Sequence, residues 1–208
     1  VLFLDEMPEF SRRSLEILRQ PLEDKVIRIS RVYGTYDFPA DFMLCAAMNP
    51  CPCGHYPDMN RCRCTPAQVM QYLGRISQPL LDRLDLCAEV SPVDFEGLSS
   101  GRKGESTQTI RERVICAQDI QRERYKIEGI QFNGELSGAQ IEKYCKMEKD
   151  ARQLLKMAFQ NMPFSARAYH RILKVARTIA DMEATESIHR HHIAEALSYR
   201  AFDKKYWN

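Results

Sequence analysis

The sequence lacks long apolar runs and any large net charge. No uninterrupted apolar stretch in the 208 residues reaches the roughly 18 residues of a membrane-spanning helix, so none is predicted. The first residues have no signal-peptide pattern. The formal net charge is only +2, which excludes a global basic field, so any nucleic-acid contact must come from a local cluster. The remaining composition is that of an ordinary soluble globular protein, with 44% hydrophobic and 28% charged residues.

A disulfide framework is also missing, because the eight cysteines do not have its spacing. Four of them follow the pattern C-x-C, eight residues, C-x-C, which is typical of a closed zinc site with four thiolates. The predicted ligands are Cys51, Cys53, Cys62 and Cys64. A reduced, metal-free loop is the alternative. The scattered cysteines are expected to be small core residues, as a reducing cytoplasm allows: Cys45, Cys87, Cys116 and Cys145.

The chain opens on four apolar residues followed by Asp5 and Glu6. This pattern predicts a strand covered on both faces, as in a parallel sheet, that delivers two carboxylates to its C-terminal edge. A Walker B motif is built in this way: the first acid holds Mg²⁺, and the second activates the water that attacks a γ-phosphate. The alternative is a buried strand that merely happens to end in two acids.

Further elements follow from periodicity and from the residues that break it. Leucines at helical spacing predict a helix that Pro21 ends or kinks. Thr65-Pro66-Ala67-Gln68 is a helix start with a Thr N-cap, Pro at the first position and a capping-box Gln. The expected elements are a helix over residues 11–22, a hairpin over 25–38, a buried strand over 42–48, a helix from Thr65 and a strand over 86–93.

Composition divides the chain into two predicted domains. Residues 95–106 are rich in Gly, Ser and charge and read as a linker. Residues 1–94 form the α/β domain. Residues 107–208 form an all-helical domain, with a capping box at Ser137 and helices expected over residues 107–125, 151–162, 165–182 and 189–199.

Several motifs fall in one order: LDEMPEF, LEILRQPLED, AAMNPCPCG, RISQPLLDRLDL, SARAYHRILKVARTIAD and HHIAEALSYR. This order resembles the second half of an AAA+ ATPase of the magnesium-chelatase-like branch, the ComM/YifB type, over nearly the whole chain. The resemblance implies an α/β fold. Its core is the second half of a P-loop NTPase with a parallel sheet, a β-hairpin and a zinc-knuckle insertion, followed by an all-α lid.

The resemblance also implies site residues for ATP and Mg²⁺. Asp5 and Glu6 are the Walker B acids. Asn49 is sensor 1, and its alternative is a loop cap at a strand end. Arg167 is sensor 2 and binds nucleotide from the lid, with Arg171 one turn further on.

Arg83 in LLDRLD resembles the arginine finger, which reaches the nucleotide of a neighbouring subunit. A surface ion pair to Asp82 or Asp85 is the alternative, and Arg75 is a second candidate for the finger. Gln78 stands where the family usually has Gly. The sequence G-x-x-x-x-G-K-[ST] is absent. We therefore expect the chain to be part of a longer protein and to be inactive alone.

The hairpin carries Arg28, Arg31 and Tyr33 on or near its tip, which suits contacts with phosphates and bases of DNA. The alternative is a solvated hairpin. The expected whole is a hexameric ring that remodels DNA, for example by branch migration. A magnesium-chelatase motor subunit and a zinc-stabilised nucleic-acid-binding module without ATPase activity are the alternatives. Three further histidines have no acidic neighbour in sequence and are interpreted as surface residues: His189, His191 and His192.

Overall fold

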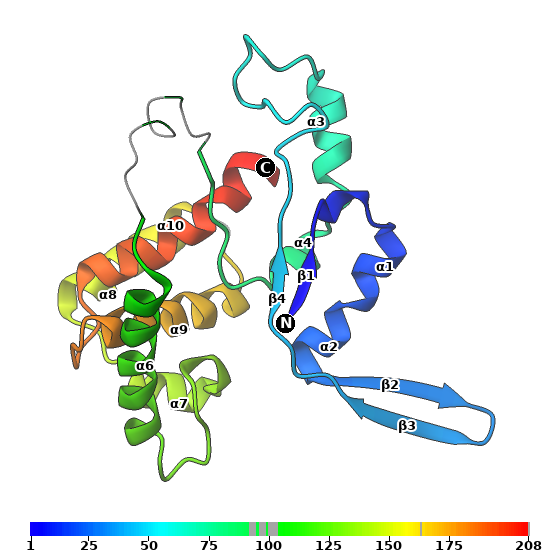
Figure 1. The fold of residues 1–208 in the computed structure, drawn as a ribbon. Coiled ribbons are helices and arrows are strands. Elements are labelled where there is room, and N and C mark those ends of the chain that lie inside the picture. Colours follow the sequence, from blue (N-terminus) through cyan, green and yellow to red (C-terminus); the bar gives the residue numbers. More distant parts are fainter. Residues whose placement is uncertain (92–94, 96–98, 100–103, 163, 208) are drawn as a thin grey trace. The chain divides into compact units, whose positions relative to one another are not determined.

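The computed structural model describes residues 1–91, 95, 99, 104–162 and 164–207. It divides into two compact units, one of residues 1–84 with 202–208 and one of residues 85–201. Figure 1 shows the helices and strands of both units. In the described part of the chain, no helix is both long and apolar enough to cross a bilayer.

The first unit is built on two parallel strands, β1 (Leu2–Leu4) and β4 (Leu44–Ala46), with Leu4 opposite Ala46. The prediction of a parallel sheet is confirmed. The prediction that β1 is buried on both faces is wrong, because Leu4 is only 8% exposed whereas Phe3 is 59% exposed. Successive side chains of a strand point to opposite faces. Only the face of Leu4 packs on the core of Met7, Leu15, Ile76, Leu80 and Leu81.

Short helices complete this unit: a 3₁₀ turn (Met7–Glu9), α1 (Arg12–Ile17), α2 (Arg19–Asp24), α3 (Pro66–Leu73) and α4 (Gln78–Leu81). The single helix predicted over residues 11–22 is therefore two helices that meet at Leu18. Pro21 has no N–H to give the carbonyl of Ile17, which explains a break at this point. The predicted capping box of Thr65 and Gln68 is present.

The predicted hairpin is confirmed as β2 (Val26–Arg31) and β3 (Gly34–Pro39), paired antiparallel. The strand predicted over residues 86–93 is wrong where it can be checked, since residues 86–91 adopt no strand and 92 and 93 lie outside the described residues. An apolar run of this length is ambiguous without a pairing partner. Most of the predicted linker also lies outside the described residues, so the predicted domain boundaries stay predictions.

The second unit is helical, as predicted. Its elements are α6 (Thr107–Arg124), a 3₁₀ turn (Asn133–Glu135), α7 (Gly138–Tyr144), α8 (Lys149–Asn161), α9 (Ala166–Met182) and the start of α10 (Arg190–Trp207). Ser106, Ser137 and Ser165 cap α6, α7 and α9 through their hydroxyls. The core is aliphatic, with Ile172, Leu173, Ala176, Ile188 and Ile193 among its most buried residues.

A buried carboxylate, Asp181, ties α6, α9 and the Asn133 turn together. Its oxygens accept from Nε of Arg177 at 3.1 Å, from Nδ2 of Asn133 at 2.8 Å and from both terminal nitrogens of Arg124. Asp181 is 1% exposed and Arg177 is fully buried. A charge removed from water in this way is tolerable only because every partner is in place.

Asp181→Asn is expected to destabilise the helical unit by about 3–5 kcal/mol, because it leaves Arg177 buried without its counter-charge. Chemical denaturation followed by circular dichroism measures the change. Asp119→Asn is the matched control, since Asp119 pairs with Arg122 on the exposed face of α6 and such pairs contribute at most about 1 kcal/mol. Equal effects of the two substitutions would show that the network adds no special stability.

Candidate nucleotide and metal sites

The carboxyl ends of β1 and β4 leave the sheet at the same edge. The ladder continues one step beyond the strands, where Ala47 N–H donates to Leu4 O at 2.8 Å and Met7 N–H donates to Ala47 O at 3.0 Å. Asp5 and Glu6 therefore follow β1, and Asn49 follows β4 at the same edge of the sheet. All three are exposed. Two carboxylates can bind a hydrated Mg²⁺, and an amide can donate a hydrogen bond to a phosphate and accept one from a water molecule.

Glu6 has an unusual backbone, with φ of 49° and ψ of 47°. The left-handed region costs a non-glycine residue about 1–2 kcal/mol. Its N–H donates to Oδ1 of Asp5 at 3.0 Å, which links the two acids. Strained residues of this kind concentrate at functional sites. The second acid of the predicted motif is thus the strained one, a feature that the sequence pattern did not reveal.

The cysteine loop lies directly against Asn49. Gly54 has φ of +78°, and a Cβ at this residue would lie 3.8 Å from Oδ1 of Asn49. The positive φ means that a side chain here would strain the backbone, while the added Cβ would make only ordinary van der Waals contact with the amide. The loop that carries the cysteines is in this way coupled to the position of the candidate sensor residue.

The four clustered cysteines gather as the spacing predicts. Their sulfurs all lie within 4.8 Å of one another. Cys51 Sγ lies 3.4 Å from that of Cys53 and 3.8 Å from that of Cys62, and the last two sulfurs are 3.6 Å apart. A tetrahedron with Zn–S bonds of about 2.3 Å has S···S edges of roughly 3.8 Å. The donor set and its dimensions therefore fit one structural zinc ion.

The surroundings of the cysteine cluster also fit thiolate ligands. Backbone N–H groups of His55 and Arg63 lower the pKa of Cys53 to about 6, and the N–H of Tyr56 donates to Cys51 Sγ at 3.4 Å. Burial raises the pKa of Cys64 to about 12, so a metal must displace its proton. Cys51 is fully buried against Val69 and Tyr72 of α3. Such hydrogen bonds and packing orient metal ligands.

The expectation for the scattered cysteines is correct only for Cys145, which is buried. Cys45 and Cys116 are exposed, and Cys87 is half-buried. Apolar neighbours in sequence do not fix which way a side chain points, and this explains the error.

Arg83 lies in a network within its own unit. Its Nε donates to the carbonyl of Arg19 at 3.1 Å and its Nη1 to that of Pro79 at 2.7 Å, while Nη2 pairs with Glu23. Its side chain is 9% exposed. The predicted alternative partners were Asp82 and Asp85, and the recorded partner is neither. In this arrangement the guanidinium is held on α2, and a role at a neighbouring nucleotide requires it to exchange these contacts.

The other candidate arginines differ in their surroundings. Arg75, the second candidate for the finger, donates to Pro8 O at 3.1 Å and to Glu9 at 3.0 Å, next to the strand-end acids. Arg167 lies exposed in the first turn of α9. Arg171, one turn on, pairs with Asp85. Arg167 is therefore the more accessible of the two sensor-2 candidates, and its role stays a prediction.

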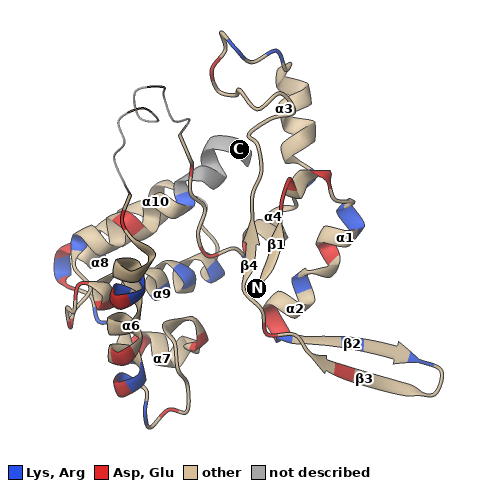
Figure 2. Ribbon diagram, in the orientation of Figure 1, with Lys and Arg blue, Asp and Glu red and all other residues tan. Residues whose placement is uncertain are grey.

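The three hairpin residues predicted to contact DNA lie at different places on the hairpin. Arg28 lies in the middle of β2 and makes two bonds to Asp37, at 2.8 and 3.0 Å. Tyr33 is 96% exposed in the turn. Arg31 ends β2 and is exposed. Figure 2 shows basic residues along β2 and an acidic residue on β3. Only Arg31 and Tyr33 lie at the predicted tip.

The prediction that the histidines around the start of α10 are surface residues is correct for His191, which is exposed, and wrong for His192; both have an acidic partner, contrary to the prediction. His192 is fully buried, and its Nε2 lies 2.9 Å from Glu183, as does that of His191. The N–H of His189 donates to Nδ1 of His192 at 3.0 Å, so Nε2 carries the proton and donates to Glu183. His192 thus offers no lone pair to a cation and serves as a helix cap.

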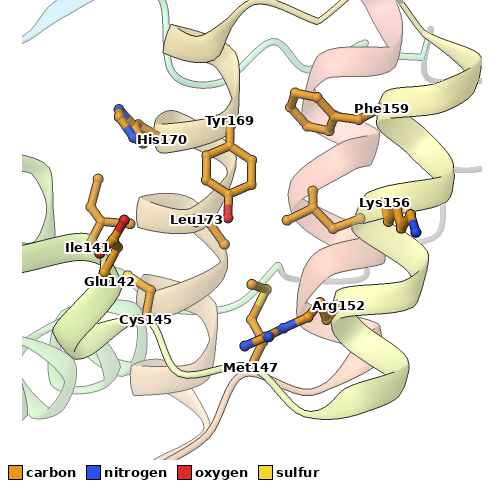
Figure 3. Close-up of a pocket in the computed structure, with 11 residues that line it drawn as sticks. Ile141, Glu142, Cys145, Met147, Arg152, Lys156, Phe159, Tyr169, His170 and Leu173 are labelled. Atoms are coloured by element: carbon orange, nitrogen blue, oxygen red, sulfur yellow. The ribbon is translucent and has the colours of Figure 1, made fainter. Parts of the chain in front are cut away.

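A pocket of about 460 Å³ lies among α7, α8 and α9 of the helical unit. Figure 3 shows Tyr169 at its centre, with Phe159 and Lys156 from α8 on one side and Cys145 from the end of α7 on the other. Burial raises the pKa of the Cys145 thiol to about 11, so this thiol is inert at neutral pH. None of the predicted site residues lines this pocket.

Comparison with known protein families identifies the class to which this chain belongs. Residues 1–98 match the family described as magnesium chelatase, subunit ChlI, and residues 104–200 match its C-terminal family. The chain belongs to the magnesium-chelatase-like family of AAA+ ATPases, ComM/YifB type.

Particular relatives align over almost the entire chain. It is 47% identical over 206 residues to the uncharacterized protein YifB of Salmonella typhimurium, covering 98% of the chain and 40% of the relative. It is 46% identical over 202 residues to the competence protein ComM of Haemophilus influenzae, covering 97% and 39%. The chain is 44% identical to the uncharacterized protein YifB of Escherichia coli, and the match covers 98% of the chain and 40% of that relative. The chain therefore spans about 40% of the length of these relatives.

Proposed function

We propose that this chain is the Walker B-to-lid portion of an AAA+ ATPase that assembles into a ring, with six subunits, and uses ATP hydrolysis to remodel DNA. The observation that supports the proposal is that Asp5 and Glu6 follow β1 and Asn49 follows β4 at the same edge of a parallel strand pair, in a chain of the magnesium-chelatase-like family. This edge is where ligands bind in open α/β folds.

Each residue has a defined task in this proposal. Bound Mg²⁺ supplies charge neutralisation at the phosphates of ATP. Asp5 holds the hydrated ion, and Glu6 accepts the proton of the attacking water. Asn49 can donate and accept at once, so it orients that water. Arg167 binds phosphate from the lid, and Arg83 neutralises charge on the neighbouring nucleotide.

DNA is proposed as the substrate on two grounds. One relative carries the name competence protein, and the hairpin offers an exposed cation and an aromatic tip. A second candidate is a magnesium-chelatase motor subunit that acts on a partner protein, which the family description favours. ATP hydrolysis by the full-length protein separates the two. Stimulation by DNA supports the first proposal, and hydrolysis indifferent to DNA supports the second.

The isolated chain is expected to show no measurable ATP turnover. It holds the acids but no G-x-x-x-x-G-K-[ST] sequence, so no loop cradles the phosphates. A phosphate-release assay on the purified chain, with Glu6→Gln as the matched background, tests this expectation. Turnover that disappears in Glu6→Gln would show that the chain contains a complete active site.

A further inference from the structure

The hairpin has two chemically different faces. Opposite residues of an antiparallel pair point to the same side, and successive pairs alternate. The register places Arg28 opposite Asp37 and Ser30 opposite Thr35 on one face. The residues of the other face are Ile27 opposite Phe38, Ile29 opposite Tyr36, and Arg31 opposite Gly34.

The polar face is satisfied within the hairpin. The guanidinium of Arg28 makes a bidentate pair with Asp37, at 2.8 and 3.0 Å. The hydroxyls of Ser30 and Thr35 lie 3.2 Å apart. Bidentate pairs are the stronger and more directional ion pairs. Arg28 is therefore committed to Asp37 and is a poor candidate for a phosphate contact.

The apolar face is open. Tyr36 is 55% exposed, Phe38 51%, Ile27 43% and Ile29 38%. The two rings stand two residues apart on one strand, roughly 7 Å along it. A two-stranded hairpin is at best marginally stable by itself, and an exposed cluster of large apolar side chains marks a contact surface. An occupant for this face is therefore expected.

The chemistry at the edge of this face points to the occupant. Arg31 lies on the same side. Its guanidinium makes no ion pair or side-chain hydrogen bond with any residue that the structure describes. The charge of Arg31 can pair with a backbone phosphate of a nucleic acid, and the rings of Tyr36 and Phe38 can contact the adjacent bases. Aromatic side chains bind bases by stacking on their faces. Base faces are accessible only where a strand is unpaired, since a duplex covers them.

We propose that Ile27, Ile29, Tyr36 and Phe38 form a stacking platform for the bases of single-stranded nucleic acid, with Arg31 on a backbone phosphate. This inference rests on the proposed DNA function and narrows its substrate from DNA in general to an unpaired strand. It assigns Tyr36 and Phe38, which the sequence pattern did not single out, and removes Arg28 from the contact.

The test measures binding of three fluorescent probes by the full-length protein with a non-hydrolysable ATP analogue: a 30-nucleotide oligo-dT, an abasic strand of equal length, and a 30-base-pair duplex. Wild type is expected to prefer oligo-dT to the abasic strand. The double variant Tyr36→Leu with Phe38→Leu keeps apolar bulk but removes both rings. Its affinity for oligo-dT should fall by roughly 5-fold or more, and its preference over the abasic strand should disappear.

Controls separate stacking from damage to the hairpin. Tyr36→Phe keeps the ring and should bind like wild type, as should Ser30→Ala with Thr35→Ala on the polar face. Arg31→Ala should reduce the dependence of affinity on salt by about one phosphate contact and leave the preference for bases intact.

Three outcomes would overturn the platform. They are equal wild-type affinity for oligo-dT and the abasic strand, an unaffected leucine variant, and a leucine variant that changes only the oligomeric state, which would make the face an interface between copies. In each of these the wild-type protein still binds DNA, so the proposed function survives. Absence of binding to all three probes would instead overturn the proposed function, and the platform with it.

Discussion

Arg83→Ala in the full-length protein is expected to leave ATP binding nearly intact and to reduce hydrolysis by roughly 10³-fold or more, the scale of arginine fingers supplied in trans. Glu6→Gln should be equally inactive, but through its own nucleotide site. Mixing the two inactive variants should then restore turnover. A mixed ring contains some interfaces that join an intact Glu6 on one subunit to an intact Arg83 on the next.

The ion pair with Glu23 provides the control for this experiment. If Arg83 acts only within its own chain, Glu23→Gln removes its counter-charge and should reproduce the loss caused by Arg83→Ala. If Arg83 acts on a neighbouring nucleotide, Glu23→Gln releases the guanidinium and should leave hydrolysis at or above the wild-type rate. Melting temperatures of all variants check that the fold is retained. Failure of assembled mixtures to recover turnover would reject the finger assignment.

Removal of zinc is the second change with a large expected effect. The protein purified without chelator should contain about one zinc ion per chain under the four-thiolate assignment. Cys62→Ser or treatment with a strong chelator should remove it and unfold the segment from Cys51 to Cys64, because binding energy at such sites is also folding energy. Hydrogen exchange across this segment and α3 should then accelerate, since Cys51 packs on Val69 and Tyr72.

Cys116→Ser is the matched control for the zinc experiment. Cys116 is exposed and lies outside the cluster, so its substitution should leave both the metal content and the exchange pattern unchanged. Elemental analysis and exchange mass spectrometry read the two quantities separately. Metal-free protein with four reactive thiols and wild-type protection of residues 51–64 would contradict a structural zinc site.

Loss of zinc should also alter the candidate nucleotide site, because disorder of the cysteine loop would change the position of Asn49. Gly54, inside the cysteine loop, lies against Asn49, so disorder in the loop releases the amide that is proposed to orient water. The zinc loop is therefore expected to affect hydrolysis through the position of Asn49.

The sequence by itself determined the features that depend on short segments. The capping boxes at Thr65 and Ser137, the hairpin over β2 and β3 and the convergence of four cysteines all follow from residues close together in the chain. Local hydrogen bonds and turn geometry decide such features, so a single sequence is sufficient to predict them. The apolar strand pattern and the family resemblance predicted a parallel sheet, but not which strands pair.

Only the tertiary structure decided which partner each side chain has. Arg83 pairs with Glu23, His192 is buried beside Glu183, and Phe3 is exposed on the strand predicted to be covered. The two faces of the hairpin likewise depend on its register, because a shift of one residue would exchange them. These features depend on residues that belong to different helices or strands. Packing geometry selects them, and no local pattern encodes that geometry.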